Sequence, residues 1–263
     1  MERPALYIVT GTSRGFGEAL AALLLEQPGT RVLALSRQVS PALQARADAQ
    51  GAALEQWPVD LRYGAAVARR LAQWLAGQPA RWREVSLVNN AALLPARIAP
   101  VSESAADDID DVLRVNLHTP LQLTAQFLRS TEAWPMPRKV LNISSGLARA
   151  PMASMALYSA AKAGVDQFTL CLALEEARKP FGAKVCALAP GVVDTGMQQQ
   201  MRDTAEAQFP DAARFRFLHA SKRLMPAGQA ARKALDLLES PDFGARPLAE
   251  LRQGAAAAPP KAP

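Results

Sequence analysis

The sequence predicts a single α/β domain built around a parallel sheet, and three observations support this prediction. Six short apolar runs alternate along the chain with longer stretches of helical periodicity, which is the pattern of right-handed β–α–β crossovers. A glycine-rich turn directly follows the first of these runs. The chain has 263 residues, of which 49% are hydrophobic, which suits one domain with a full core and leaves no room for a separate substrate domain.

The six predicted strands are short apolar runs with turn-forming residues at their ends. Runs this apolar are typical of strands that are buried on both faces, so helices are expected on both sides of the sheet. The chain has no internal repeat beyond this alternation. The strands are expected at Leu6–Thr10, Arg31–Ser36, Ala53–Asp60, Val85–Asn90, Lys139–Ser144 and Lys184–Pro190.

The glycines of the first turn predict a dinucleotide site. The strand Leu6–Thr10 leads into Gly11-Thr12-Ser13-Arg14-Gly15-Phe16-Gly17, and a helical pattern follows at once. Gly11 allows the tight turn, Gly15 lets backbone N–H groups approach a pyrophosphate, and Gly17 lets helix and strand pack closely. Glycine also serves ordinary turns, but its position at the end of the first strand favours the dinucleotide interpretation.

A tyrosine and a lysine at helical spacing indicate a proton-transfer site. Tyr158 and Lys162 are four residues apart in an alanine-rich stretch that runs to about Arg178, so their side chains share one helix face. The ammonium group is expected to lower the phenol pKa from its usual value of ~10. Ser145, or its competitor Ser144, could hydrogen-bond the same reacting oxygen from a different element. The spacing alone is common on helix surfaces.

A proline interrupts the long helix predicted over Asp107–Thr131. Pro120 has no N–H group, so the carbonyl four residues earlier, that of Asn116, loses its helical partner. The alternative interpretation is an ordinary proline kink.

These motifs together resemble the short-chain dehydrogenase/reductase family over about residues 5–250. Two further turns of the resemblance, after the fourth and sixth strands, are Asn89-Asn90-Ala91-Ala92 and Pro190-Gly191-Val192-Val193-Asp194-Thr195. The resemblance implies an α/β fold of Rossmann type, a single-domain doubly wound parallel sheet of six to seven strands with helices on both faces. The seventh strand is expected around Ala245–Leu251, although Arg246-Pro247 make a poor strand.

The resemblance also implies roles in carbonyl reduction for four residues. Tyr158 gives a proton to the carbonyl oxygen and Ser145 hydrogen-bonds that oxygen; the thirteen-residue interval between them matches the family and selects Ser145 over Ser144. Lys162 binds the nicotinamide ribose and favours the phenolate. The carbonyl of Asn116 holds a water that links the lysine to solvent.

The end of the second predicted strand favours NADP(H) as the cofactor. An acidic residue there would bind the adenosine ribose hydroxyls, but this chain has Ser36-Arg37, and Arg14 lies in the glycine turn. Two guanidinium groups can form charge-assisted contacts with a 2′-phosphate. Ala92 stands where the family usually has glycine. The predicted cofactor-binding residues are Gly11, Ser13, Arg14, Gly15, Phe16, Gly17, Ser36, Arg37, Asp60, Leu61, Asn90, Ala91, Tyr158, Lys162, Pro190, Gly191, Val193 and Thr195.

The substrate is expected to be a ketone or diketone, because the closest likeness within the family is to the sepiapterin and benzil reductases. Leu248 occupies the place of the aspartate that anchors the pterin in sepiapterin reductases, and Glu250 lies two residues on. The missing anchor favours less polar substrates. The lid segment, Gly196–Leu224, is interpreted either as a mobile substrate cover or as ordinary core packing. The segments of the likeness are Ser13–Gly17, Ala34–Arg37 and Asp194–Gln198.

Two other functions stay open. The first is a 3-oxoacyl-thioester reductase or an NADP-dependent alcohol dehydrogenase. The second belongs to a different class, a non-catalytic NADP-sensing binding protein. Such proteins usually lack the tyrosine or the lysine, and this chain has both Tyr158 and Lys162.

Composition argues against several other classes of function. The net charge is +6 and the pI is about 9.7, yet the basic residues are scattered singly, without the aromatic-interleaved patch of a nucleic-acid site. Cys171, Cys186, His118 and His219 lack metal-ligand spacing, so no metal is expected, and both cysteines are expected in the core.

The remaining expectations concern the surroundings of the chain. No apolar run approaches the ~18 residues that span a bilayer, so a cytoplasmic protein without membrane contact is expected. Residues 1–253 are expected to form the domain, and residues 254–263 a disordered tail of low complexity. As is typical of the family, the protein is expected to be a homodimer or a homotetramer.

Overall fold

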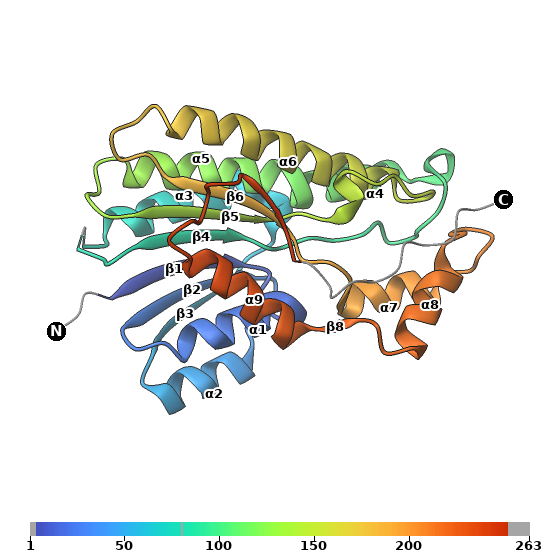
Figure 1. The fold of residues 1–263 in the computed structure, drawn as a ribbon, viewed down its shortest axis with the longest axis horizontal. Coiled ribbons are helices and arrows are strands. Elements are labelled where there is room, and N and C mark those ends of the chain that lie inside the picture. The colour runs from blue at the N-terminus through green and yellow to red at the C-terminus, as the bar shows by residue number, and fades with distance from the viewer. Residues whose placement is uncertain (1–3, 80, 252–263) are drawn as a thin grey trace.

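The computed structural model describes residues 4–79 and 81–251 and shows a single α/β domain around a seven-stranded parallel sheet (Figure 1). The strand order is β3-β2-β1-β4-β5-β6-β9. The order reverses between β1 and β4, and at such a point the carboxyl ends of parallel strands leave a crevice for a ligand. The strands are β1 Ala5–Thr10, β2 Thr30–Ser36, β3 Ala53–Pro58, β4 Val85–Asn89, β5 Arg138–Ile143, β6 Lys184–Ala189 and β9 Leu248–Glu250.

All six strands predicted from apolar runs are confirmed, and the seventh forms as well. β9 pairs in parallel with β6 and has only three residues. It begins directly after Pro247, whose carbonyl accepts a hydrogen bond from the Ala187 N–H at 2.7 Å. A proline at the entrance of an edge strand costs little because its carbonyl can still pair.

Helices cover both faces of the sheet, as predicted (Figure 1). One hydrophobic core packs the sheet against α1, α2 and α9, and a second core packs the other face against α3, α5 and α6. The helices are α1 Gly15–Leu25, α2 Pro41–Gln50, α3 Gly64–Ala76, α4 Ala106–Leu113, α5 Thr119–Thr131, α6 Ala156–Glu176, α7 Gly196–Asp203, α8 Ala212–Ala220 and α9 Ala227–Glu239.

The long helix predicted over residues 107–131 is interrupted near the predicted place. α4 and α5 are joined by a π-helical turn, Arg114–His118, and Pro120 lies in the first turn of α5. The N–H of Thr119 donates to the carbonyl of Arg114, five residues back. A wider turn of this kind is a common response where the ordinary i to i+4 pattern fails.

The lid segment forms α7 and α8, which project beyond the carboxyl ends of the strands (Figure 1). The pair of short strands β7 (Val193–Asp194) and β8 (Met225–Pro226) joins the two ends of the segment. A third apolar cluster buries lid side chains, among them Met201, Phe209 and Phe215, against Tyr158. Packing is therefore one role of the segment, and its mobility stays a prediction.

Two smaller expectations have different outcomes. Cys186 is buried in β6, but Cys171 is exposed on α6, so the prediction of a core position for Cys171 is wrong. Helical periodicity alone did not show that this position faces away from the sheet. The predicted disordered tail, residues 254–263, lies outside the described residues.

Candidate active site

A cavity of about 1020 Å³ opens at the carboxyl ends of the strands. Its wall is formed by the turns that follow the strands, together with α6 and the lid segment. Every residue predicted to bind the cofactor lies on this wall, and so do Ser145, Tyr158 and Lys162. Residues from seven separate parts of the chain thus meet at one surface because the parallel strands all end there.

Tyr158 and Lys162 lie in the first turns of α6 and are both buried, with 6% and 3% of their surface exposed. The Lys162 Nζ donates a hydrogen bond to the carbonyl oxygen of Ile143, the last residue of β5, at 2.7 Å. The same Nζ lies 5.7 Å from the centre of the Tyr158 ring. The ammonium group is therefore fixed beside the phenol by the end of the neighbouring strand.

Burial decides the protonation of both groups. It raises the pKa of Tyr158 to about 12, against a smaller lowering by the Ser145 hydroxyl. It lowers the pKa of Lys162 to about 8, against a smaller raising by the charge of Asp166. The expectation that the ammonium lowers the phenol pKa below its usual value is wrong for this structure, since desolvation of the phenolate dominates the pKa of Tyr158. Tyr158 is a protonated phenol at neutral pH.

The two candidate serines are in different environments. Ser145 lies on the cavity wall, where its Oγ accepts a hydrogen bond from the Leu147 N–H at 3.2 Å at the start of the 3-10 turn η4, Gly146–Ala148. Ser144 is buried, and its Oγ donates to Asp166 at 2.5 Å. The geometry agrees with the choice of Ser145, because Ser144 is already committed to a carboxylate.

Asn116 does not lie on the cavity wall, unlike the other three predicted catalytic residues. It is fully buried in the π-helical turn. Its amide exchanges two hydrogen bonds with the backbone of Leu93, one in each direction, both at 2.8 Å. The side chain therefore fastens the loop after β4 to the helix. The role predicted for its backbone carbonyl stays a prediction.

The glycine turn fits a dinucleotide pyrophosphate. Gly11 and Gly15 have φ values of +74° and +64°, which L residues with a side chain rarely adopt. A Cβ on Gly17 would lie 2.3 Å from the carbonyl oxygen of Gly11. No side chain caps the N-terminus of α1, so its first N–H groups are available to an anion on the cavity side.

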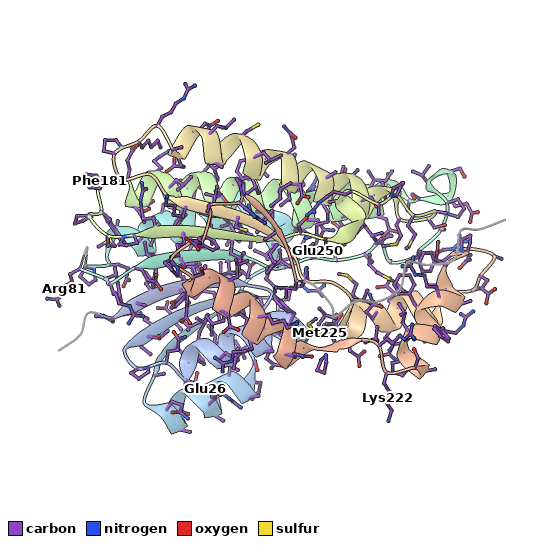
Figure 2. The ribbon with its side chains drawn as sticks, viewed as in Figure 1. Glu26, Arg81, Phe181, Lys222, Met225 and Glu250 are labelled. Atoms are coloured by element: carbon purple, nitrogen blue, oxygen red, sulfur yellow. The ribbon has the colours of Figure 1, made fainter. Side chains whose placement is uncertain are left out.

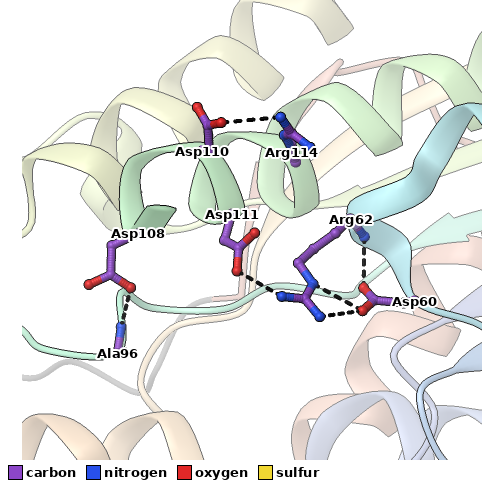
Figure 3. Close-up of polar contacts among 7 residues, drawn as sticks. All are labelled: Asp60, Arg62, Ala96, Asp108, Asp110, Asp111 and Arg114. Atoms are coloured by element: carbon purple, nitrogen blue, oxygen red, sulfur yellow. Dashed lines mark hydrogen bonds and ion pairs between the residues drawn. The ribbon is translucent and has the colours of Figure 1, made fainter. Parts of the chain in front are cut away.

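The arginines on the cavity wall fall into two groups. Arg62 donates to the Oδ2 of Asp60 through its Nε and Nη2, at 2.9 and 2.7 Å, and to Asp111 on α4 through its Nη1 at 3.2 Å (Figure 3). The pKa of Asp60 is lowered, mainly by these hydrogen bonds. Arg14 and Arg37 are exposed on the wall, and within the described part of the chain neither forms an ion pair with a carboxylate. These two remain available for a phosphate.

The part of the cavity next to the lid segment has many apolar lining residues, together with the lid side chains Gln198, Gln200 and Arg214. Glu250 lies on its wall, at the end of β9 where the sheet meets α7 (Figure 2). Leu248, which occupies the aligned position of the pterin-anchoring aspartate, is not on the wall. The apolar lining residues are Leu93, Leu94, Leu147, Met152, Val192, Met197, Met201, Phe215 and Leu218.

Four site residues were missed from the sequence, namely Arg62, Asp111, Arg149 and Asp166. Each forms a charged contact with a residue that is distant in the chain, as Arg62 does with Asp111, 49 positions away. The position of Asp166, four residues after Lys162 on one helix face, was the signal that could have been used for it.

Two negative findings concern only the residues that the structure describes. Within them, no group of three or more His, Cys, Asp or Glu side chains is arranged to hold a metal ion. None of the helices in residues 4–79 and 81–251 is both long enough and apolar enough to cross a membrane.

Comparison with known proteins agrees with this geometry. The family model of the short chain dehydrogenases matches residues 5–206. A benzil reductase ((S)-benzoin forming) of Bacillus cereus is 33% identical over 237 residues, which cover 90% of this chain and 94% of that protein. A sepiapterin reductase of Rattus norvegicus is 32% identical over 254 residues, covering 91% and 93%. The crystal structure of the KRED1-Pglu enzyme has a TM-score of 0.78 at 26% identity, covering 94% of this chain and 100% of that one.

The family model matches most of the chain. Both relatives are named as reductases, and the match spans nearly the whole length of each. The parallel sheet, the glycine turn and the Tyr158–Lys162 pair are the structural counterparts of this match. The chain therefore belongs to the short-chain dehydrogenase/reductase family and is an oxidoreductase that acts on CH–OH or C=O groups with a nicotinamide dinucleotide.

Proposed function

We propose that this protein is an NADPH-dependent reductase of ketones or diketones, with Tyr158 as the general acid. The observation that carries the proposal is the buried phenol of Tyr158, protonated at neutral pH, on the same cavity wall as Ser145 and Lys162. A reduced nicotinamide dinucleotide bound along this wall supplies the hydride. The protein must then supply a proton and a site for the carbonyl oxygen.

The residues divide this work by position. Tyr158 gives its proton to the carbonyl oxygen, and the Ser145 hydroxyl donates a hydrogen bond to the same oxygen and fixes its place. Lys162, fixed by the Ile143 carbonyl, stabilises the phenolate that results, because a cation 5.7 Å from the ring centre is weakly screened in a buried site. Lys162 is also placed to bind the ribose of the dinucleotide.

The protonation of Tyr158 suits its role as the acid of the reduction. A phenol with a pKa of about 12 is ready to donate a proton at neutral pH. The reverse alcohol oxidation uses the same phenol as a base, so the alcohol dehydrogenase alternative is tested by assaying both directions.

Preference for the phosphorylated cofactor rests on the end of β2. Ser36 lies there beside Arg37, no acidic residue follows the strand, and Arg14 lies on the wall of the same cavity. Two unpaired guanidinium groups can bind a 2′-phosphate with charge-assisted hydrogen bonds. Arg62 is excluded from this role by its two carboxylates.

The substrate class rests on the lining beside the lid segment. Leucine, methionine and phenylalanine side chains form much of it, and such a surface favours an apolar ketone over a strongly hydrated one. The 33% identity to a benzil reductase, over 90% of this chain, points to aromatic diketones as the first compounds to test.

The test is a panel of carbonyl compounds assayed with NADPH and with NADH at the 340 nm band of the reduced nicotinamide. Benzil with NADPH is expected to give the highest kcat/KM, and acetoacetyl thioesters a much lower one. A preference for the thioester would establish the 3-oxoacyl-thioester reductase instead. Tight NADPH binding without turnover of any compound would establish the binding-protein alternative.

A further inference from the structure

Asp166 is a buried carboxylate beside the site, and the proposed reaction does not use it. It lies on α6, four residues after Lys162, and is 6% exposed. Its Oδ1 accepts a hydrogen bond from the Ser144 Oγ at 2.5 Å, and its Oδ2 accepts one from the Arg149 Nε at 3.1 Å. Burying a carboxylate is costly unless both of its oxygens are paired, and in Asp166 both are paired with residues of the neighbouring turn.

The two partners of Asp166 lie at the two ends of one turn. Ser144 directly precedes Ser145, and Arg149 directly follows the 3-10 turn Gly146–Ala148 that Ser145 begins. Both bonds reach from this turn to α6, the helix that carries Tyr158. One carboxylate therefore fastens both ends of the Ser145 turn to the helix that presents the general acid.

An uncharged hydrogen bond also joins β5 to α6 and can be compared with the contacts of Asp166. One turn further along α6, the Thr169 Oγ1 accepts from the Asn142 amide at 2.9 Å and donates to the Val165 carbonyl at 2.8 Å. Thr169 is fully buried, and neither of these two bonds reaches the Ser145 turn. It joins the same strand and helix without charge, so the charge of Asp166 is not needed merely to pack them.

We infer that Asp166 is a positioning residue, which sets the place of the Ser145 hydroxyl relative to the Tyr158 phenol by fastening the turn 144–149 to α6. The expected loss of kcat rests on the proposed function, whereas the fastening of the turn to α6 does not. Asp166 does not touch the reacting atoms; it acts through the backbone of the turn. Its charge also raises the pKa of Lys162, and Arg149→Gln keeps that charge, so this variant tests the fastening alone. A displacement of Ser145 by about 1 Å is enough to cost about 100-fold in rate.

Asn is the informative replacement at this position. An amide has nearly the volume of the carboxylate but carries no charge. Its oxygen can accept from the Arg149 Nε–H and its NH2 can donate to the Ser144 hydroxyl, but both bonds lose the charge that strengthens them. Asp166→Asn therefore weakens the fastening of both ends of the turn and leaves the packing in place. Arg149→Gln releases the distal end from the outside, since 43% of the Arg149 side chain is exposed, and it protects the test if Asp166→Asn does not fold.

The experiment compares Asp166→Asn and Arg149→Gln with Thr169→Val, the matched control in the same strand–helix contact. Amide hydrogen exchange of residues 145–150 is measured alongside benzil reduction by NADPH. Asp166→Asn is expected to speed exchange in this turn and to lower kcat by about 10- to 100-fold, with the KM for NADPH within about twofold. Arg149→Gln is expected to show the same pattern more weakly. Thr169→Val is expected to lower the melting temperature and leave both exchange in the turn and kcat unchanged.

The exchange measurement separates this inference from the proposed function. If wild-type protein reduces no carbonyl compound, the proposed function fails, while faster exchange in Asp166→Asn still supports the fastening of the turn. If exchange in residues 145–150 of Asp166→Asn equals that of wild type, or if Thr169→Val loses as much kcat as Asp166→Asn, the positioning role is overturned. In a double-mutant cycle, Ser144→Ala is expected to reduce kcat little further in the Asp166→Asn background, because both changes act on the same Ser144–Asp166 hydrogen bond.

Discussion

Two buried cations lie at opposite ends of β5 and are treated differently. Arg138 begins the strand with 1% of its side chain exposed, 3.7 Å from the equally buried carboxylate of Glu176. Lys162 lies against the other end of the strand and bonds the Ile143 carbonyl, and within the described residues it forms no ion pair. The cation at the amino edge of the sheet is neutralised, while the cation at the carboxyl edge faces a cavity.

The difference shows how a fold can bury charge for two purposes. The Glu176 carboxylate also accepts the Ala183 N–H at 2.8 Å, and Arg138 donates to the Phe181 carbonyl at 2.7 Å. This set of bonds closes the loop between α6 and β6 and leaves no charge for chemistry. Lys162 instead has a pKa that burial has lowered to about 8, which means that its charge is held at a cost in stability. We expect this loss of stability to accompany the presence of a cation beside Tyr158.

The largest expected effect is on turnover at the carboxyl edge. Tyr158→Phe removes the proton donor and keeps the ring that packs against the lid segment, so benzil reduction should fall by about 10³-fold or more. NADPH binding, followed by fluorescence titration, should stay nearly as tight as in wild type. Substantial residual turnover in this variant would remove Tyr158 from the proposed mechanism.

The next effect is on stability at the amino edge. Glu176→Gln leaves the guanidinium of Arg138 buried beside a neutral amide, and breaking a buried pair in this way costs about 3–5 kcal/mol. Urea unfolding should show this loss, while kcat of the folded variant at a temperature well below its melting point stays unchanged. A variant with wild-type stability would show that the Arg138 charge is compensated elsewhere.

The third prediction concerns the pH dependence of the cation at the carboxyl edge. The pKa of Lys162 is about 8 in the folded chain and about 10.5 when unfolded, so between these pH values the unfolded chain binds more protons. The stability of wild type relative to Lys162→Met should therefore rise as the pH increases from about 8 to 10.5, by about 3 kcal/mol in total. Paired urea titrations at pH 7, 9 and 10 measure the difference, and a flat difference would contradict the burial of a charged lysine.

Much of this site could be predicted from the sequence because its signals are local. Gly11, Gly15 and Gly17 follow one strand within seven residues, and Tyr158 and Lys162 share one helix face. The six longer strands were predicted correctly because each one is a local apolar run. The pKa shift of Tyr158 was predicted with the wrong sign because its burial depends on Met201, Phe209 and Phe215 of the lid segment, which no spacing near Tyr158 reveals.

Contacts between distant segments were also beyond the sequence. The Asn116 side chain pairs with Leu93, 23 residues away, and Ser144 pairs with Asp166, 22 residues away. Polar residues of this kind have many potential partners, and only the packing of α4, α6 and the loop after β4 selects one. The backbone argument for Asn116 from Pro120 correctly located the irregular turn, but it did not predict where the side chain points.

The smallest expected effect comes from a cation that is neither buried nor free. Arg62 bridges Asp60 and Asp111 at the rim of the cavity, and its side chain is 43% exposed (Figure 3). Asp111→Asn makes the same carboxylate-to-amide change as Glu176→Gln, but solvent and salt screen the charges at the rim. The melting temperature should therefore fall slightly at low salt and match wild type at high salt.

The control for this last variant lies on the same helix. Among the residues that the structure describes, the Asp110 side chain pairs only with Arg114, one turn further along the chain, at 3.1 Å, and Asp110 is not on the cavity wall. Asp111→Asn frees Arg62 from α4 beside Asp60, a predicted cofactor-binding residue, so the KM for NADPH should rise by roughly two- to threefold, whereas Asp110→Asn should leave it unchanged. Equal KM values in the two variants would show that the bridge does not order this rim. If Asp111→Asn lost as much stability as Glu176→Gln, burial would not explain the difference between the buried Arg138–Glu176 pair and the exposed Arg62 bridge.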